Sequence, residues 1–130
     1  MNTSTHTLHL TASKQAAFAF LSKIENLPKW ATRFCKELKK DASGRDKIMT
    51  PKGEIFFRIE ADPETGVIDM YGGPAPDAEA YWPARVVEQP GNGSLFIFTA
   101  MHYPGVSDAD FAAQCEGLEA EFEHIKRHVE

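Results

Sequence analysis

The last long stretch of the chain, residues 107–129, decides the fold; it reads SDADFAAQCEGLEAEFEHIKRHV. Ser107 is a favourable helix cap, and Asp110 takes the place of the usual Glu in a capping box. Apolar residues then recur at steps of three and four, which places them on one helix face: Phe111, Cys115, Leu118, Phe122, Ile125 and Val129. The pattern predicts a long amphipathic helix that must bury one side.

The rest of the chain is mostly short β-rich runs separated by turns that contain Gly, Pro, Asn and Asp. A first strand is predicted at residues 7–11, and two short helices follow at 14–22 and 27–32. Further strands are predicted at 34–40, 47–50, 54–61, 67–71, 80–88 and 94–102. Gly72 to Pro76 is expected to be a flexible loop, which could gate a pocket or be only a turn. Strands joined by hairpin-length loops indicate an antiparallel meander.

A sheet of about six or seven strands needs a cover for its apolar face, and the stripe on the 107–129 helix is about as long as such a sheet. The sequence therefore predicts an α+β fold. A curved antiparallel sheet wraps the C-terminal helix, and residues 1–130 form a single domain.

Three segments carry a resemblance to a known family: residues 11–13, which open the first helix, residues 24–30 (IENLPKW), and the terminal helix. In these the chain resembles the helix-grip superfamily, the SRPBCC proteins. It includes START lipid-transfer domains, birch-pollen-allergen-like proteins and polyketide cyclase or dehydrase relatives. The resemblance implies a helix-grip fold with a cavity between sheet and helix that holds a hydrophobic or aromatic ligand.

Composition excludes several other classes of protein. The formal net charge is −5, with 19 acidic and 14 basic residues, so nucleic-acid binding is not expected. No signal peptide or membrane span is visible, and a cytoplasmic location is expected. Cys35 and Cys115 are far apart and have no metal-type spacing, so reduced thiols and no metal or cofactor are expected.

Alternation along the strands predicts which side chains face the helix. Ile55, Phe57 and Ile59 share one apolar face, and Trp82 shares another with Ala84 and Val86. Trp30 could line the mouth of the cavity or be a core residue that closes that end. The residues predicted to contact a ligand are Trp30, Ile55, Phe57, Ile59, Trp82, Phe98, His102, Phe111, Cys115, Leu118 and Phe122.

The strand at 94–102 is apolar on both faces. Phe96, Phe98, Ala100 and His102 lie on one side, and Leu95, Ile97, Thr99 and Met101 lie on the other. Alternation does not say which side faces the helix. A strand that is apolar on both sides is expected to be buried on both. We therefore predict a homodimer through the outer face of the sheet.

Polar candidates for chemistry are few. His102 could act as an acid or base near neutral pH, and Asp69 and Tyr71 share a strand face. His124 and His128 are one helical turn apart but lack a third ligand, so solvated surface is the better interpretation. Three functions stay open: binding of a small hydrophobic molecule, a cyclase or dehydratase that uses polar groups in the cavity, and a structural homodimer with a filled core.

Overall fold

The computed structural model describes residues 2–130 and contains one antiparallel sheet and a long helix. The helices are α1 (Lys14–Leu21), the 3-10 turn η1 (Ile24–Asn26), α2 (Leu27–Trp30) and α3 (Asp108–Val129). The strands are β1 (Thr3–Leu10), β2 (Glu37–Lys40), β3 (Asp46–Thr50), β4 (Gly53–Asp62), β5 (Val67–Ala75), β6 (Ala78–Trp82), β7 (Ala84–Glu88) and β8 (Ser94–Met101). The predicted α+β architecture is confirmed.

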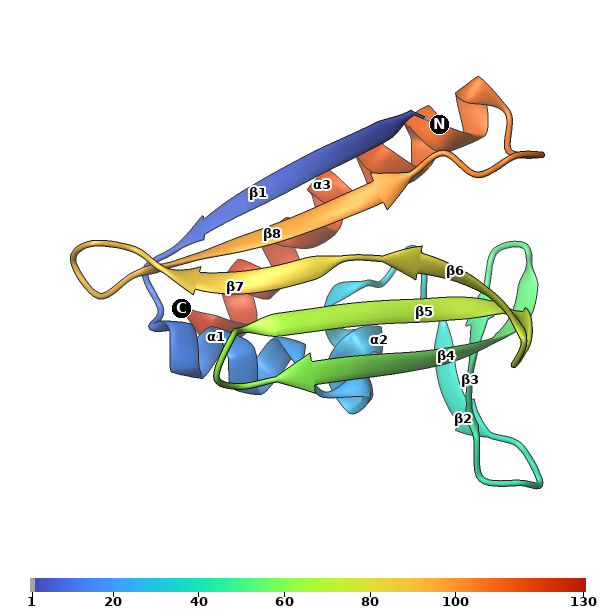
Figure 1. Cartoon of the computed structure of the whole chain (residues 1–130), viewed down its shortest axis with the longest axis horizontal. Coiled ribbons are helices and arrows are strands. Elements are labelled where there is room, and N and C mark those ends of the chain that lie inside the picture. The colour runs from blue at the N-terminus through green and yellow to red at the C-terminus, as the bar shows by residue number, and fades with distance from the viewer. Residues whose placement is uncertain (1) are drawn as a thin grey trace.

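The sheet brings the first and last strands of the chain side by side. Its order is β1-β8-β7-β5-β4-β3-β2, and β6 also pairs with β5. The first and last strands are neighbours along their whole length, from Thr3 opposite Met101 to Leu10 opposite Ser94. In Figure 1, α3 crosses behind β1 and β8, and α1 and α2 lie behind the other half of the sheet.

Both main helices begin where the sequence indicates. The Ser13 hydroxyl accepts a hydrogen bond from the Ala16 N–H at 3.1 Å, and the Ser107 hydroxyl accepts one from the Asp110 N–H at 3.1 Å. Each bond satisfies one of the backbone donors that a helix start leaves free. In α3, the buried residues Leu118, Phe122 and Ile125 lie on the predicted apolar face.

The structure identifies the inward side of β8. Phe96, Phe98 and Ala100 are buried on the helix side, whereas Leu95 and Ile97 are half-buried on the other. The outward residues are partly covered because β8 lies between β1 and β7, with both strands paired to it. Packing within the sheet therefore explains part of the apolar character of the outward side, and the homodimer stays a prediction.

Several predicted boundaries are wrong. Gly72 and Gly73 are buried within β5, not in a flexible loop. A Cβ on Gly73 would lie 1.8 Å from the Ala78 carbonyl oxygen, so these glycines allow the close approach of β5 and β6. The single strand predicted at 80–88 is two strands, because Pro83 separates β6 from β7.

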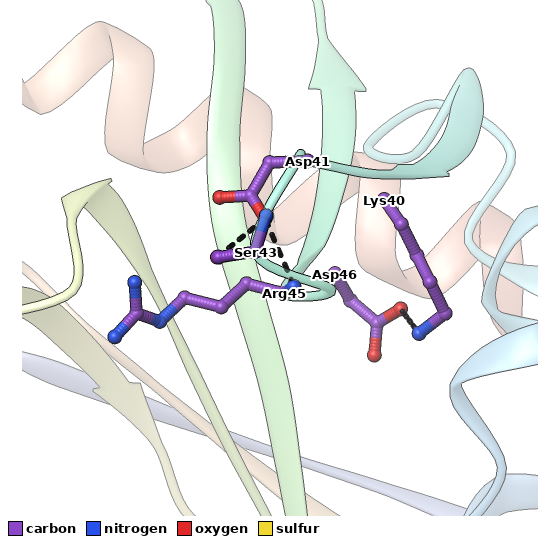
Figure 2. A network of polar contacts seen from close by, with 5 residues as sticks. All are labelled: Lys40, Asp41, Ser43, Arg45 and Asp46. Atoms are coloured by element: carbon purple, nitrogen blue, oxygen red, sulfur yellow. Dashed lines mark hydrogen bonds and ion pairs between the residues drawn. The ribbon is translucent and has the colours of Figure 1, made fainter.

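The β2–β3 hairpin is held by polar contacts at its turn, which Figure 2 shows. One oxygen of Asp41 accepts hydrogen bonds from the Ser43 N–H at 2.8 Å and the Arg45 N–H at 3.0 Å. Lys40 and Asp46 form an ion pair of 2.8 Å across the two strands. The strand predicted from residue 34 begins only at Glu37, and residues 32–34 form a turn beneath α3.

Candidate functional site

A cavity of about 360 Å³ lies between α3, the segment that runs from α2 through residue 34, and the inner face of the sheet. Its apolar lining is Leu27, Trp30, Ala31, Phe34, Pro51, Phe57, Met70, Trp82, Phe98, Ala100, Ala113, Gly117 and Leu118. Its polar lining is Arg33, Thr50, Lys52, Asp110, Gln114 and Glu121. The wall is therefore mostly apolar, with few polar groups.

Three aromatic rings form one side of the cavity. The Phe34 ring lies edge-on to Phe57 at 5.8 Å and to Trp82 at 5.7 Å between centroids. Phe57 and Trp82 are 6.0 Å apart. These distances are typical of favourable aromatic pairs. Phe34 comes from the turn after α2, whereas Phe57 and Trp82 come from the sheet, so the aromatic cluster joins the two walls.

The exposed part of the lining, here called the rim, carries the charged side chains of Arg33, Lys52 and Asp110. Lys52, in the turn between β3 and β4, forms an ion pair of 3.0 Å with Asp110 in the first turn of α3. This contact keeps the pKa of Asp110 below its ordinary value. Both side chains are exposed, so the pair is expected to contribute little to stability. The ion pair links the β3–β4 turn of the sheet to the first turn of α3 at the rim of the cavity.

Glu121 is the polar group that lies deepest in the lining. Its side chain comes from α3 and is buried. One oxygen, Oε2, accepts hydrogen bonds from the Arg33 N–H at 3.0 Å and the Phe34 N–H at 3.1 Å. Burial raises the pKa of Glu121 above its ordinary value of 4.5, although these bonds and the charge of Arg33 act in the opposite direction. The carboxyl group therefore holds the turn that carries Phe34.

Several predicted contact residues lie in the cavity wall and others do not. Trp30, Phe57, Trp82, Phe98 and Leu118 line it. The residues outside the lining are Ile55, Ile59, His102, Phe111, Cys115 and Phe122.

Three of the residues outside the lining make aromatic contacts elsewhere. The Phe122 ring packs against Phe96 in the core, with ring centroids 5.7 Å apart, and the Phe111 ring stacks on the His102 ring, with centroids 4.7 Å apart. The apolar stripe of α3 faces the core around β1 and β8, and the cavity lies along a neighbouring strip of the helix.

The polar groups that a cyclase or dehydratase would need in the cavity, His102 with Asp69 or Tyr71, do not converge there. His102 is bonded to the Val106 carbonyl oxygen through Nε2. Asp69 and Tyr71 lie on the outer face of the sheet, where the Tyr71 ring stacks on Tyr81 at 5.0 Å. The alternation of β5 sends Met70 and Gly72 inward, so their neighbours must point outward.

Sequence reasoning missed the cavity-facing strip of α3. Asp110, Gln114, Gly117 and Glu121 follow one another at steps of three and four, beside the apolar stripe. The same periodicity could have found this second strip. Its small and polar residues give no signal when only the apolar residues of the helix are followed.

A serine, a histidine and a carboxylate lie in a row between β1 and α3. Ser4 Oγ is 2.9 Å from His6 Nε2, and His6 Nδ1 is 2.6 Å from a carboxylate oxygen of Glu119. None of the three lines the cavity. Through the contact between His6 and Glu119, these side chains connect the edge strand β1 to α3.

Beside α2 lies a second hollow, of about 220 Å³, lined by Lys29, Thr32, His124, Arg127 and His128. The two histidines are used separately: His124 Nδ1 is 3.2 Å from the Trp30 carbonyl oxygen, and the His128 ring stacks on Phe20. Within residues 2–130, no group of three or more His, Cys, Asp or Glu could hold a metal ion.

Comparisons with solved structures find the same architecture over nearly the whole chain. XoxI from Bacillus cereus matches with a TM-score of 0.75 and 17% identity, over 99% of this chain and 96% of that one. The Aha1 dimer from Colwellia psychrerythraea matches with a TM-score of 0.70 and 19% identity, over 100% and 97%. Ara h 8.0201 matches with a TM-score of 0.68 and 13% identity, over 98% and 97%.

The chain has the helix-grip fold. No protein-family model and no curated protein matches the sequence. At these identities, the structural likeness establishes the helix-grip fold alone. The cavity described above lies between the sheet and the terminal helix of this fold. None of the helices described in residues 2–130 is long and apolar enough to cross a membrane.

Proposed function

We propose that the protein binds a small hydrophobic or aromatic molecule in the cavity between the sheet and α3. The observation that carries the proposal is the cavity itself: about 360 Å³, open at a polar rim and lined mainly by apolar side chains. Ligand sites in proteins commonly span roughly 300–1,000 Å³ with such a lining. The volume is near the lower end of that range, which favours a molecule of one or two rings.

The wall also favours an aromatic ligand. Phe34, Phe57 and Trp82 present ring edges and faces from two sides. A flat molecule between them would gain offset-stacked or edge-to-face contacts beyond the burial of its surface. A structural protein with a filled core would leave no such space.

The cyclase or dehydratase alternative has less support. Such an enzyme needs polar groups that converge on the bound molecule. Of the titratable groups in the lining, Arg33, Lys52 and Asp110 are exposed at the rim, and Glu121 is buried. The lining holds no second buried acid or base beside Glu121, which favours binding over catalysis.

The test is to fill the cavity without changing the rest of the sheet. Ala100 is buried on the inner face of β8 and lines the cavity, so Ala100→Leu places extra bulk inside it. Thr99→Leu adds similar bulk one residue away on the outer face. Titration with an environment-sensitive naphthalene dye should show binding at least about tenfold weaker in Ala100→Leu, and unchanged within about twofold in Thr99→Leu. Equal binding by all three proteins would overturn the proposal.

We also propose that two copies associate through the outward side of β8. Ile97 and Leu95 are half-buried there in the single chain, and association would cover what remains exposed. The similar Aha1 structure is that of a dimer, which supports the proposal. Sedimentation velocity at micromolar concentration should give a dimer that Ile97→Glu converts to a monomer. A monomer in the unchanged protein would refute it.

A further inference from the structure

Among residues 2–130, Glu121 is the one Asp, Glu, Lys or Arg that is buried, with 5% of its surface exposed. A buried carboxylate is unfavourable unless its oxygens are bonded. The two oxygens of Glu121 differ in this respect. Oε2 accepts both backbone N–H groups of the turn, whereas Oε1 makes no hydrogen bond to any residue in the described chain.

The free oxygen is not sealed inside the protein. Among the described residues, no buried side-chain nitrogen or oxygen lacks a hydrogen-bond partner. Oε1 therefore reaches open space, and the open space that Glu121 adjoins is the cavity. The result is a single acceptor atom in a wall that is otherwise mostly apolar at this depth.

The acceptor lies next to the aromatic cluster. The Phe34 N–H bonds to the other oxygen of the same carboxyl group, and the Phe34 ring contacts both Phe57 and Trp82. A ring held by this cluster would therefore lie close to Glu121. Buried polar groups in a site discriminate strongly against ligands that leave them unpaired.

We propose that Oε1 of Glu121 selects the ligand, and that the molecule bound in the cavity is an aromatic compound with a hydroxyl or N–H group that donates to this oxygen. The inference rests on the proposed binding function and adds to it the chemical class of the ligand. The ring lies among the aromatic side chains, and its donor group points to α3. An equivalent molecule without the donor leaves the carboxylate desolvated and unpaired.

Naphthol and methoxynaphthalene are a matched pair of probes for the experiment, because they share the ring and differ in the donor. Glu121→Gln keeps an amide oxygen for the Arg33 and Phe34 N–H groups, but presents an NH₂ donor to the cavity in place of the acceptor. Glu123→Gln removes a charge from the exposed side of the same helix and is the control.

The unchanged protein and Glu123→Gln should bind naphthol about tenfold or more tightly than methoxynaphthalene, as measured by titration calorimetry. In Glu121→Gln the ratio should fall to about twofold or reverse. Equal binding of both probes by the unchanged protein would overturn the role of Glu121 and leave the binding function standing. Binding of neither probe would overturn both. A naphthol preference that persists in Glu121→Gln would also overturn the role of Glu121.

A second measurement keeps the inference open to refutation if Glu121→Gln does not fold. Acidification protonates Glu121, and with Oε2 occupied the proton resides on Oε1, which then donates. The preference of the unchanged protein for naphthol should therefore vanish at low pH. The other titratable groups that face this carboxyl group are Arg33, Cys35 and His124. The profile is repeated in His124→Gln, and a preference that does not change with pH in both proteins would refute the inference.

Discussion

Replacement of Glu121 tests how the cavity wall is held together. The carboxyl group joins α3 to the turn at residues 32–34 through two backbone N–H groups, at 3.0 and 3.1 Å. Glu121→Ala leaves both donors without a protein partner. Glu121→Gln keeps an acceptor of the same shape in the same place. The two variants therefore separate the hydrogen bonds from the charge.

The expected magnitudes follow from the contacts. A buried backbone donor without a partner costs about 1–3 kcal/mol, and two donors lose theirs in Glu121→Ala. Removal of a buried charge offsets part of this loss, and water can enter from the adjoining cavity. We expect Glu121→Ala to lower the free energy of unfolding by about 2–4 kcal/mol, and Glu121→Gln to change it by less than about 1 kcal/mol.

The difference in stability between the unchanged protein and Glu121→Gln also depends on pH, and the pKa of Glu121 determines the sign of this dependence. The pKa of Glu121 is raised in the folded chain, so the folded chain binds this proton more tightly than the unfolded chain. The resulting stabilisation is complete below the ordinary pKa of 4.5 and is lost as the pH rises through the folded value. Glu121→Gln does not titrate. The unchanged protein should therefore lose stability relative to Glu121→Gln as the pH rises.

Urea unfolding, followed by circular dichroism between pH 4 and pH 8, measures both effects. The pKa values of Asp41 and Glu54 are lowered, which gives a pH dependence of opposite sign, but these residues are common to both proteins and cancel in the difference. A Glu121→Ala protein as stable as the unchanged one would refute the structural role of the carboxyl group. A stability difference between the unchanged protein and Glu121→Gln that grows in the opposite direction would refute the raised pKa.

Two further predictions concern the core and the glycines. Phe96 is fully buried and packs against Trp30 and Phe122, so Phe96→Ala should lower the free energy of unfolding by about 3–5 kcal/mol in urea; a loss below about 1 kcal/mol would contradict this packing. Gly73→Ala should destabilise by about 3 kcal/mol or more, because the new Cβ meets a backbone oxygen at 1.8 Å. Gly117→Ala should instead stabilise by about 0.5–1 kcal/mol, since Ala is favoured over Gly inside a helix and its Cβ would make an ordinary contact of 3.6 Å with the Arg33 side chain; thermal melts that rank these two variants the other way would be inconsistent with the structure.

The architecture could be predicted because its signals are local and repeated. The caps at Ser13 and Ser107 and the stripe of α3 are confirmed, since each depends on residues only a few positions apart. The buried position of Gly73 could not be predicted in this way. It depends on contact with Ala78 across a strand pair, and a glycine next to a proline resembles a turn when read alone.

The cavity was harder to predict than the fold. Apolar periodicity shows which residues are buried in the folded chain, but it does not distinguish residues that fill the core from residues that line a cavity. Phe122 and Leu118 belong to the same stripe, yet only Leu118 reaches the cavity. Glu121 was missed because an acidic residue on a helix is usually exposed, and its burial depends on two backbone donors from a turn 87 and 88 residues away.

The central claim is that a small aromatic molecule enters the cavity between sheet and helix. Titration of the isotope-labelled protein with naphthol, followed by amide NMR, tests it most directly. Binding in the cavity should give saturable shifts concentrated at the lining, above all at Phe34, Gly117 and Glu121, with little change at Tyr71 on the outer face. Shifts centred on the outer face, or no saturable shifts at all, would contradict it.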